Sequence, residues 1–178
     1  MMLETLRQSI PEPAKDARLN LEAVLRPGPL DAAQRWGSAV AAALTARSPQ
    51  LAEALAEAAT GEGVSVAALE DAHAAAALMA MTNVYYRFRH LVDRPEYEAE
   101  RPGLRMNRML RPSGKKVDYE LFCLVASALN ACESCVRAHE RVLREAGLTP
   151  AQINDAIRIA SSVASAAVSL ELPPLPVS

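Results

Sequence analysis

Two cysteines three positions apart, Cys132 and Cys135, are the residues of this sequence best suited to chemistry, and His139 follows four positions later. A thiolate is a nucleophile and a metal ligand, and two thiols at this spacing can close a disulfide. On a helix, at about 100° per residue, the three positions lie within roughly 60° of one another. The imidazole can therefore take the proton of Cys135 or stabilise its thiolate. The run contains a nucleophile, a resolving thiol and a base.

The residues just before the first cysteine carry a helix-start signal. Asn130, followed three positions later by Glu133, resembles a capping box, which predicts that a helix begins at Ala131 and that Cys132 lies in its first turn. Free backbone N–H groups and the positive end of the helix dipole stabilise a thiolate there. We therefore expect the pKa of Cys132 to lie below its free value of about 8.5.

The two cysteines are expected to play different parts. The helix dipole favours Cys132 as the nucleophile, whereas direct pairing with His139 favours Cys135. Our interpretation makes Cys135 the base-activated thiol and Cys132 the more exposed exchange partner. Both orders of attack are compatible with the spacing.

A carboxylate near the start of the preceding helix is a further candidate. Glu120 belongs to a predicted helix over residues 119–129, which almost no loop separates from the next helix over 131–146. We therefore expect the two helices to cross at a steep angle. Glu120 could orient or protonate His139, although a solvated residue in the first helical turn explains it more simply.

The cysteine pair has three explanations, namely a redox dithiol, half of a zinc site, or coincidence. A structural zinc site usually needs four ligands, and the three cysteines of the chain offer no second pair. A non-enzymatic zinc-binding or redox-sensing interaction module that uses the same Cys/Cys/His cluster is the alternative function.

The third cysteine, Cys123, lies in an apolar helix and is expected to be a small buried hydrophobe. His73 and His90 are assigned no role.

The composition narrows the class of protein. The 178 residues suit one domain, and 51% are hydrophobic but only 4% aromatic, which favours a helical core of Ala, Leu and Val. The net charge is −2 and the basic residues are spread along the chain, so nucleic-acid binding is not expected. The N-terminal residues lack the apolar stretch of a secretory signal, and residues 157–172 carry two charges, so we expect a cytoplasmic protein without a membrane span.

The elements that must position the reactive groups are all helical in our prediction. Helical patterns recur from end to end without a convincing strand, so the predicted fold class is all-α. The expected helices cover residues 3–10, 14–25, 31–47, 49–59, 66–92, 119–129, 131–146 and 150–170. Three prolines and two glycines predict a surface connector over about 94–117. Residues 1–178 are interpreted as one domain, with an N-terminal half of about 1–93 and a catalytic half of about 118–178.

Helix boundaries are marked by capping residues. Asp31, Ser48 and Thr149 are each expected to cap the helix that follows, the last two directly before a proline. Gly147 is expected to close the preceding helix in the left-handed conformation.

The two halves of the chain resemble each other. A shift of 84 residues pairs Ser65, Leu69, Asp71 and Ala72 with Thr149, Ile153, Asp155 and Ala156, and a shift of 85 pairs residues 42–46 with 127–131. With the shift of 85, Cys132, Cys135 and His139 match Arg47, Gln50 and Ala54. We expect two related helical halves that share one core, with the reactive groups in the second half only.

The combination of Glu120, Cys132-x-x-Cys135 and His139 resembles the catalytic signature of the alkyl hydroperoxide reductase AhpD family, within the carboxymuconolactone-decarboxylase-like superfamily. The likeness extends over nearly the whole chain, including residues 13–16, 19–21, 101–107 and 138–140. One departure is Ser134, which stands where some members have a histidine between the cysteines. It bears on the thiol pKa values and on the choice of partner.

The resemblance implies a duplicated all-helical fold and a homotrimeric antioxidant enzyme. It implies a lipoyl-dependent peroxidase that also passes reducing equivalents from dihydrolipoamide to the peroxiredoxin AhpC. Its electron donor would be a lipoyl-bearing protein, a dihydrolipoyl acyltransferase, with its dehydrogenase. Cys132 and Cys135 would be the redox pair, His139 the proton-transfer residue and Glu120 the carboxylate of the relay. No tightly bound cofactor or metal is expected, and a decarboxylase is disfavoured because its chemistry does not require two neighbouring thiols.

Overall fold

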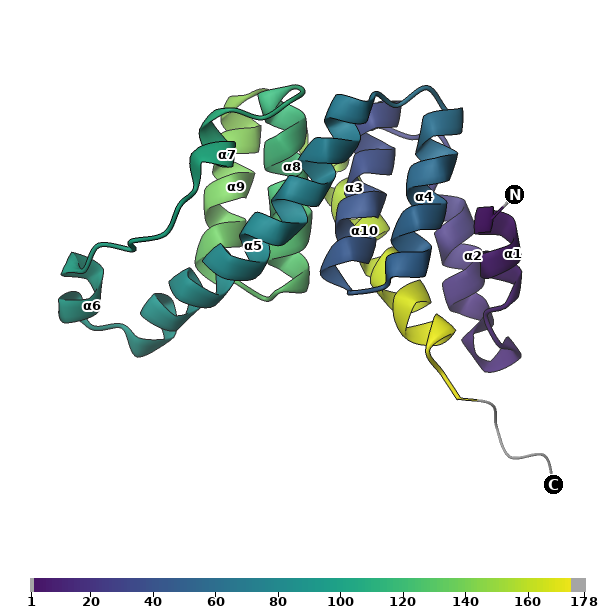
Figure 1. Ribbon diagram of the computed structural model, residues 1–178, viewed down its shortest axis with the longest axis horizontal. Coiled ribbons are helices and arrows are strands. Elements are labelled where there is room, and N and C mark those ends of the chain that lie inside the picture. Colours follow the sequence, from purple (N-terminus) through teal and green to yellow (C-terminus); the bar gives the residue numbers. More distant parts are fainter. Residues whose placement is uncertain (1, 174–178) are drawn as a thin grey trace.

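Helices make up the regular structure of residues 2–173, the part of the chain that the computed structural model describes (Figure 1). This confirms the predicted all-α class. The helices are α1 (Met2–Gln8), the 3-10 turn η1 (Glu12–Ala14), α2 (Lys15–Val24), α3 (Ala32–Thr45), α4 (Pro49–Gly61), α5 (Val66–Val92), α6 (Pro95–Ala99), α7 (Asn107–Leu110), α8 (Lys116–Leu129), α9 (Glu133–Glu145) and α10 (Pro150–Leu170). No helix in this part of the chain is long and apolar enough to cross a membrane.

The duplication has one register, a shift of 84 residues. Helices α3, α4 and α5 begin at Ala32, Pro49 and Val66, and α8, α9 and α10 begin at Lys116, Glu133 and Pro150, each 84 positions further on. The turns agree, because Arg47 and Ala131 both have a positive φ, of 59° and 52°. Two related helical halves therefore stand side by side in one fold.

The shift of 85 was wrong for the reactive residues. Backbone bonds Ser48 N to Ala43 O and Cys132 N to Ser127 O occupy equivalent places in the two turns. The equivalents of Cys132, Cys135, His139 and Glu120 are therefore Ser48, Leu51, Leu55 and Trp36. The match between residues 42–46 and 127–131 is too short and too rich in alanine to define the register, because alanine repeats fit several registers.

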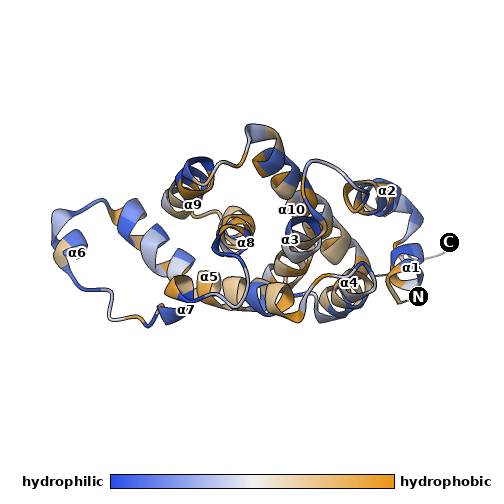
Figure 2. Ribbon diagram, turned by 90° about the horizontal axis from the view of Figure 1, so that it is seen from above, coloured by the Kyte–Doolittle hydropathy of each residue, from blue (hydrophilic) through white to orange (hydrophobic). Residues whose placement is uncertain are grey.

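Helix α8 lies at the centre of the molecule. Every residue from Asp118 to Ser127 is buried, and α3, α5, α9 and α10 surround the helix (Figure 2). Helix α3 approaches α8 so closely that a Cβ atom on Gly37 would lie 2.1 Å from Cζ of Phe122. A glycine at this position lets the two halves share one core.

The capping predictions are mostly confirmed. Asp31 accepts a hydrogen bond from Gln34 N at 2.8 Å, Thr149 and Gln152 form a reciprocal capping box on α10, and Gly147 has a φ of 94°. Ser48 does not cap α4 with its side chain, so that prediction was wrong. Its backbone N–H closes the preceding turn and its side chain is buried in that tight connection.

The connector between α5 and α8 leaves the far end of α5, passes through α6 and returns through α7 (Figure 1). The division of the chain near residues 93 and 117 remains a prediction.

Candidate active site

A tight turn between α8 and α9 positions the two cysteines. Asn130 ends α8, Ala131 takes a left-handed conformation, and α9 begins only at Glu133 with Cys132 as its N-cap residue. The predicted start at Ala131 was therefore wrong. The side chain of Asn130 does not cap α9, because it donates to Oδ1 of Asn83 on α5 at 3.0 Å. Cys132 stands before the first turn.

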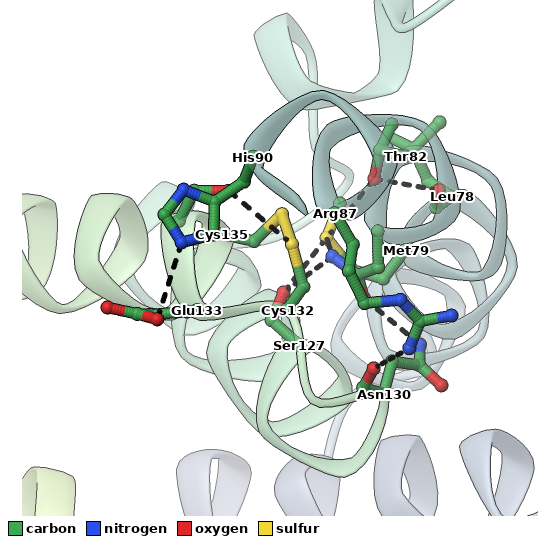
Figure 3. Close-up of a disulfide and its surroundings, with 12 residues drawn as sticks. Leu78, Met79, Thr82, Arg87, His90, Ser127, Asn130, Cys132, Glu133 and Cys135 are labelled. Atoms are coloured by element: carbon green, nitrogen blue, oxygen red, sulfur yellow. Dashed lines mark hydrogen bonds and ion pairs between the residues drawn. A yellow bond between two sulfur atoms is a disulfide. The ribbon is translucent and has the colours of Figure 1, made fainter. Parts of the chain in front are cut away.

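The two cysteines form a disulfide, with their Cα atoms 5.3 Å apart (Figure 3). Cys132 has no exposed surface and Cys135 is 8% exposed. The expectation that Cys132 is the more exposed thiol was therefore wrong. The backbone N–H of Cys132 donates to the carbonyl of Ser127 in α8. The turn therefore buries Cys132 completely, while Cys135 in the first turn of α9 keeps a small exposed surface.

His139 and Glu120 are direct partners. Nδ1 of His139 lies 2.7 Å from Oε2 of Glu120, and the two side chains are 8% and 9% exposed. Because a carboxylate only accepts, Nδ1 donates, which leaves Nε2 for exchange of a proton. The arrangement does not depend on a steep crossing, since α8 and α9 are both seen end-on from above and run alongside each other (Figure 2). The prediction of a steep angle was wrong.

A cavity of about 410 Å³ opens beside the outer thiol. Cys135 and His139 both line it, together with Met79, Thr82, Tyr86, Met106, Met109, Ser134 and Ala138. The walls are mainly apolar, so the cavity suits an organic group whose reactive end reaches the sulfur. A larger cavity of about 510 Å³ lies between the N-terminal helices. Cysteine and histidine are absent from its lining, so the smaller cavity is the better candidate for redox chemistry.

A chain of buried and half-buried polar side chains holds the turn against α5. Asn83 of α5 donates to Ser127 at 3.0 Å and accepts from Asn130, and Arg87 donates to the backbone carbonyl of Asn130 at 2.6 Å (Figure 3). Ser127 in turn contacts the sulfur of Met79 at 3.4 Å. Sequence analysis missed Asn83 and Arg87, because a polar residue within a long helix has no local pattern that points to a turn 43 or more residues away.

His90, to which the sequence assigned no role, lies near the cysteine pair. Nε2 of His90 lies 3.4 Å from Oε2 of Glu133, the residue that follows Cys132 (Figure 3). Arg137 donates to the same carboxylate at 2.7 Å. The hydrogen bond from Arg137, with a smaller contribution from His90, lowers the pKa of Glu133. His90 therefore lies beside the disulfide, in contact with the carboxylate that Arg137 binds.

The remaining cysteine is a core residue, as predicted. Cys123 has no exposed surface, and burial raises the pKa of its thiol far above the ordinary value. A buried neutral thiol is a poor nucleophile.

The arrangement gives little support to a metal site. Across residues 2–173, no group of three or more His, Cys, Asp or Glu side chains is placed to hold a metal ion. The imidazole pairs with Glu120 and the thiols pair with each other, so the donor atoms do not converge on one point.

Comparisons with known proteins identify similar sequences over nearly the whole chain. Residues 95–171 match the carboxymuconolactone decarboxylase family model. A protein of Anaeromyxobacter dehalogenans named alkyl hydroperoxide reductase AhpD is 54% identical over 96% of this chain and 91% of its own length. Proteins of the same name from Azorhizobium caulinodans and Solibacter usitatus are 48% and 46% identical, over 96% and 97% of this chain and 94% and 97% of their own lengths.

Proposed function

The chain belongs to the alkyl hydroperoxide reductase AhpD family, and we propose that it reduces alkyl hydroperoxides through a reversible dithiol of Cys132 and Cys135. The name that the relatives share supports a peroxidase or oxidoreductase activity. One observation carries the proposal: Cys135 and His139 line the same cavity while Glu120 holds Nδ1 of the imidazole.

In the first step, His139 takes the proton of Cys135, and the thiolate attacks the terminal oxygen of the hydroperoxide. The O–O bond breaks, the departing alkoxide accepts the proton from His139 and leaves as an alcohol, and Cys135 is left as a sulfenic acid. Glu120 stabilises the charged imidazole during the transfer. Cys135 is placed for this role because it is the cysteine that reaches the cavity.

In the second step, the sulfur of Cys132 attacks that of Cys135, so a disulfide forms and the hydroxyl leaves as water with the proton of Cys132. The Cα separation of 5.3 Å lies within the range for a disulfide, about 4.4–6.8 Å. Cys132 is shielded from solvent, which limits its own reaction with peroxide and leaves its thiol to resolve the sulfenic acid at Cys135.

In the third step, dihydrolipoamide reduces the disulfide and is itself oxidised to the cyclic disulfide lipoamide. The overall reaction converts one hydroperoxide and one dihydrolipoamide into an alcohol, water and lipoamide. The same reduced dithiol would reduce the disulfide of an AhpC-type peroxiredoxin. The lipoyl donor, the AhpC partner, the homotrimer and the cytoplasmic location rest on the family resemblance and are part of this proposal.

The test is steady-state reduction of cumene hydroperoxide with dihydrolipoamide as donor, with and without an AhpC-type peroxiredoxin. Cys132→Ser and Cys135→Ser should each abolish turnover, because closing the disulfide requires both sulfurs. Cys123→Ala is the matched control and should keep turnover, since its thiol is buried in the core. Full activity in either of the first two variants would contradict the dithiol mechanism.

A further inference from the structure

A buried aspartate on α5 ties down the connector. Asp71 is 1% exposed and accepts three hydrogen bonds: from Nη2 of Arg108 at 2.9 Å, from Ser113 N at 2.8 Å and from Gly114 N at 2.7 Å. The hydroxyl of Ser113 accepts a further bond from Arg108 at 2.7 Å and donates to Glu70 at 2.8 Å. All three donors to Asp71 belong to residues 106–114, which we call the strap.

The strap forms one wall of the redox cavity. Arg108, which the aspartate holds, lies between Met106 and Met109 in the chain, and both methionines line the cavity together with Cys135 and His139. The charge-assisted bond from Arg108 and the two backbone bonds thus fix the position of the methionine wall.

The other half of the fold contains a matching aspartate. Asp155 of α10 stands 84 positions after Asp71, is 6% exposed, and bonds to Arg158 at 2.7 Å. In both places a glycine approaches the carboxylate, since a Cβ atom on Gly114 or on Gly28 would lie 3.3 Å from Oδ2 of its aspartate. Asp155 holds no segment that lines the redox cavity, so it provides a control of equivalent burial and fold position.

We propose that Asp71 is a positioning residue that locks the strap over the cavity, and that the locked strap controls which molecules reach Cys135. The second half of this inference deepens the proposed function and rests on it. With the strap in place, the thioether side chains of Met106 and Met109 line one wall of the cavity and favour an apolar reactant. With the strap released, the cavity opens to bulky reagents and loses its preference.

Asp71→Asn is the informative variant because it preserves size. The amide loses the charge opposite Arg108 and turns an N–H group toward one of the strap donors, so at least one hydrogen bond is replaced by a repulsive contact. The same change at Asp155 also removes a charge opposite an arginine, away from the cavity.

The first measurement is independent of peroxidase activity. Reduced protein is alkylated with N-ethylmaleimide and with a bulky fluorophore-maleimide, and mass spectrometry follows modification of Cys135. In Asp71→Asn the bulky reagent should react about three- to tenfold faster relative to the small one, by loss of about one hydrogen bond. Asp155→Asn should keep the wild-type ratio. Equal ratios in wild type and Asp71→Asn, with unchanged circular dichroism, would contradict the proposal that Asp71 holds the strap over the cavity.

The second measurement is the ratio of kcat/KM for cumene hydroperoxide to kcat/KM for hydrogen peroxide. Cumene hydroperoxide is far smaller than a fluorophore-maleimide, so it gains little from a wider opening but loses apolar contacts with the methionine wall. Asp71→Asn should therefore lower this ratio through a higher KM for cumene hydroperoxide. The effect should shrink in a Met109→Ala background because Asp71 acts through that wall. If Asp71→Asn leaves this kcat/KM ratio unchanged, the strap does not control the selectivity between the two peroxides. A wild-type protein that reduces neither peroxide would contradict the proposed function, while the alkylation ratios would still decide whether Asp71 holds the strap.

Discussion

Nδ1 of His139 and Oε2 of Glu120 lie 2.7 Å apart although 19 positions separate the residues in the chain. Both residues lie on the two arms of one helical hairpin, α8 and α9, which reverse direction at residues 130–132. Each is about two to three turns from the reversal, so the arms bring them face to face. The pairing is buried beside the outer cysteine, where a fixed imidazole can move a proton.

This pairing predicts coupled losses of activity. His139→Phe and Glu120→Gln should each lower peroxide turnover, by about 10²- to 10⁴-fold for the histidine as general base. Because the two residues act as one unit, the double variant should be little worse than the worse single variant. The check is a double-mutant cycle on lipoamide-dependent turnover, with circular dichroism to confirm folding. Losses that multiply would mean that the residues act independently, and an inert Glu120→Gln would remove the carboxylate from the mechanism.

A second prediction concerns the pH dependence of stability. Asp118 at the start of α8 is buried, and burial raises the pKa of its carboxyl. A raised pKa in the folded state means that the native protein binds the proton more tightly than the unfolded chain does. The contribution of Asp118 to stability is therefore largest at low pH and falls as pH rises from the ordinary carboxyl value through the raised one.

Asp118→Asn removes this titration while its Oδ1 can still accept the bond from Gln34. The variant should gain stability relative to wild type between pH 4 and pH 7, as measured by urea denaturation at both values. A relative stability that decreases over that interval would show that the folded state favours the charged carboxylate.

A third prediction tests the contact between the two halves. In Gly37→Ala the new methyl group would meet the ring of Phe122 at 2.1 Å, so the variant should lose about 1–3 kcal/mol of unfolding free energy through overpacking. Gly61→Ala is the matched control, because that helical glycine has open space around its Cβ position, and it should be neutral or slightly stabilising. Thermal or urea denaturation of both variants measures the difference. Equal stabilities would mean that α3 can shift away from α8 at little cost.

Sequence patterns predicted those features that depend on neighbouring residues. The helices over 66–92 and 150–170 were predicted to their end residues, because a long helical pattern lies within each segment. In the structure the residue directly before each segment, Ser65 or Thr149, caps the helix. The start of α9 was not, because the side chain of Asn130 is engaged by Asn83, 47 positions earlier. Glu120 and His90 depend in the same way on how distant helices pack. The identity and spacing of the reactive residues can be read from a short stretch of sequence, but their partners are set by tertiary contacts.

In the proposed mechanism one hydroperoxide oxidises the Cys132–Cys135 dithiol as a pair, and counting the remaining thiols is the decisive experiment. Fully reduced protein receives one equivalent of cumene hydroperoxide, after which alcohol formation and the alkylatable cysteines are measured by mass spectrometry under denaturing conditions. A dithiol mechanism should yield one alcohol per chain, loss of two thiols at Cys132 and Cys135, retention of Cys123, and recovery of both thiols with dihydrolipoamide. Alcohol formation with both cysteines still free, or with Cys123 consumed in place of either, would contradict it.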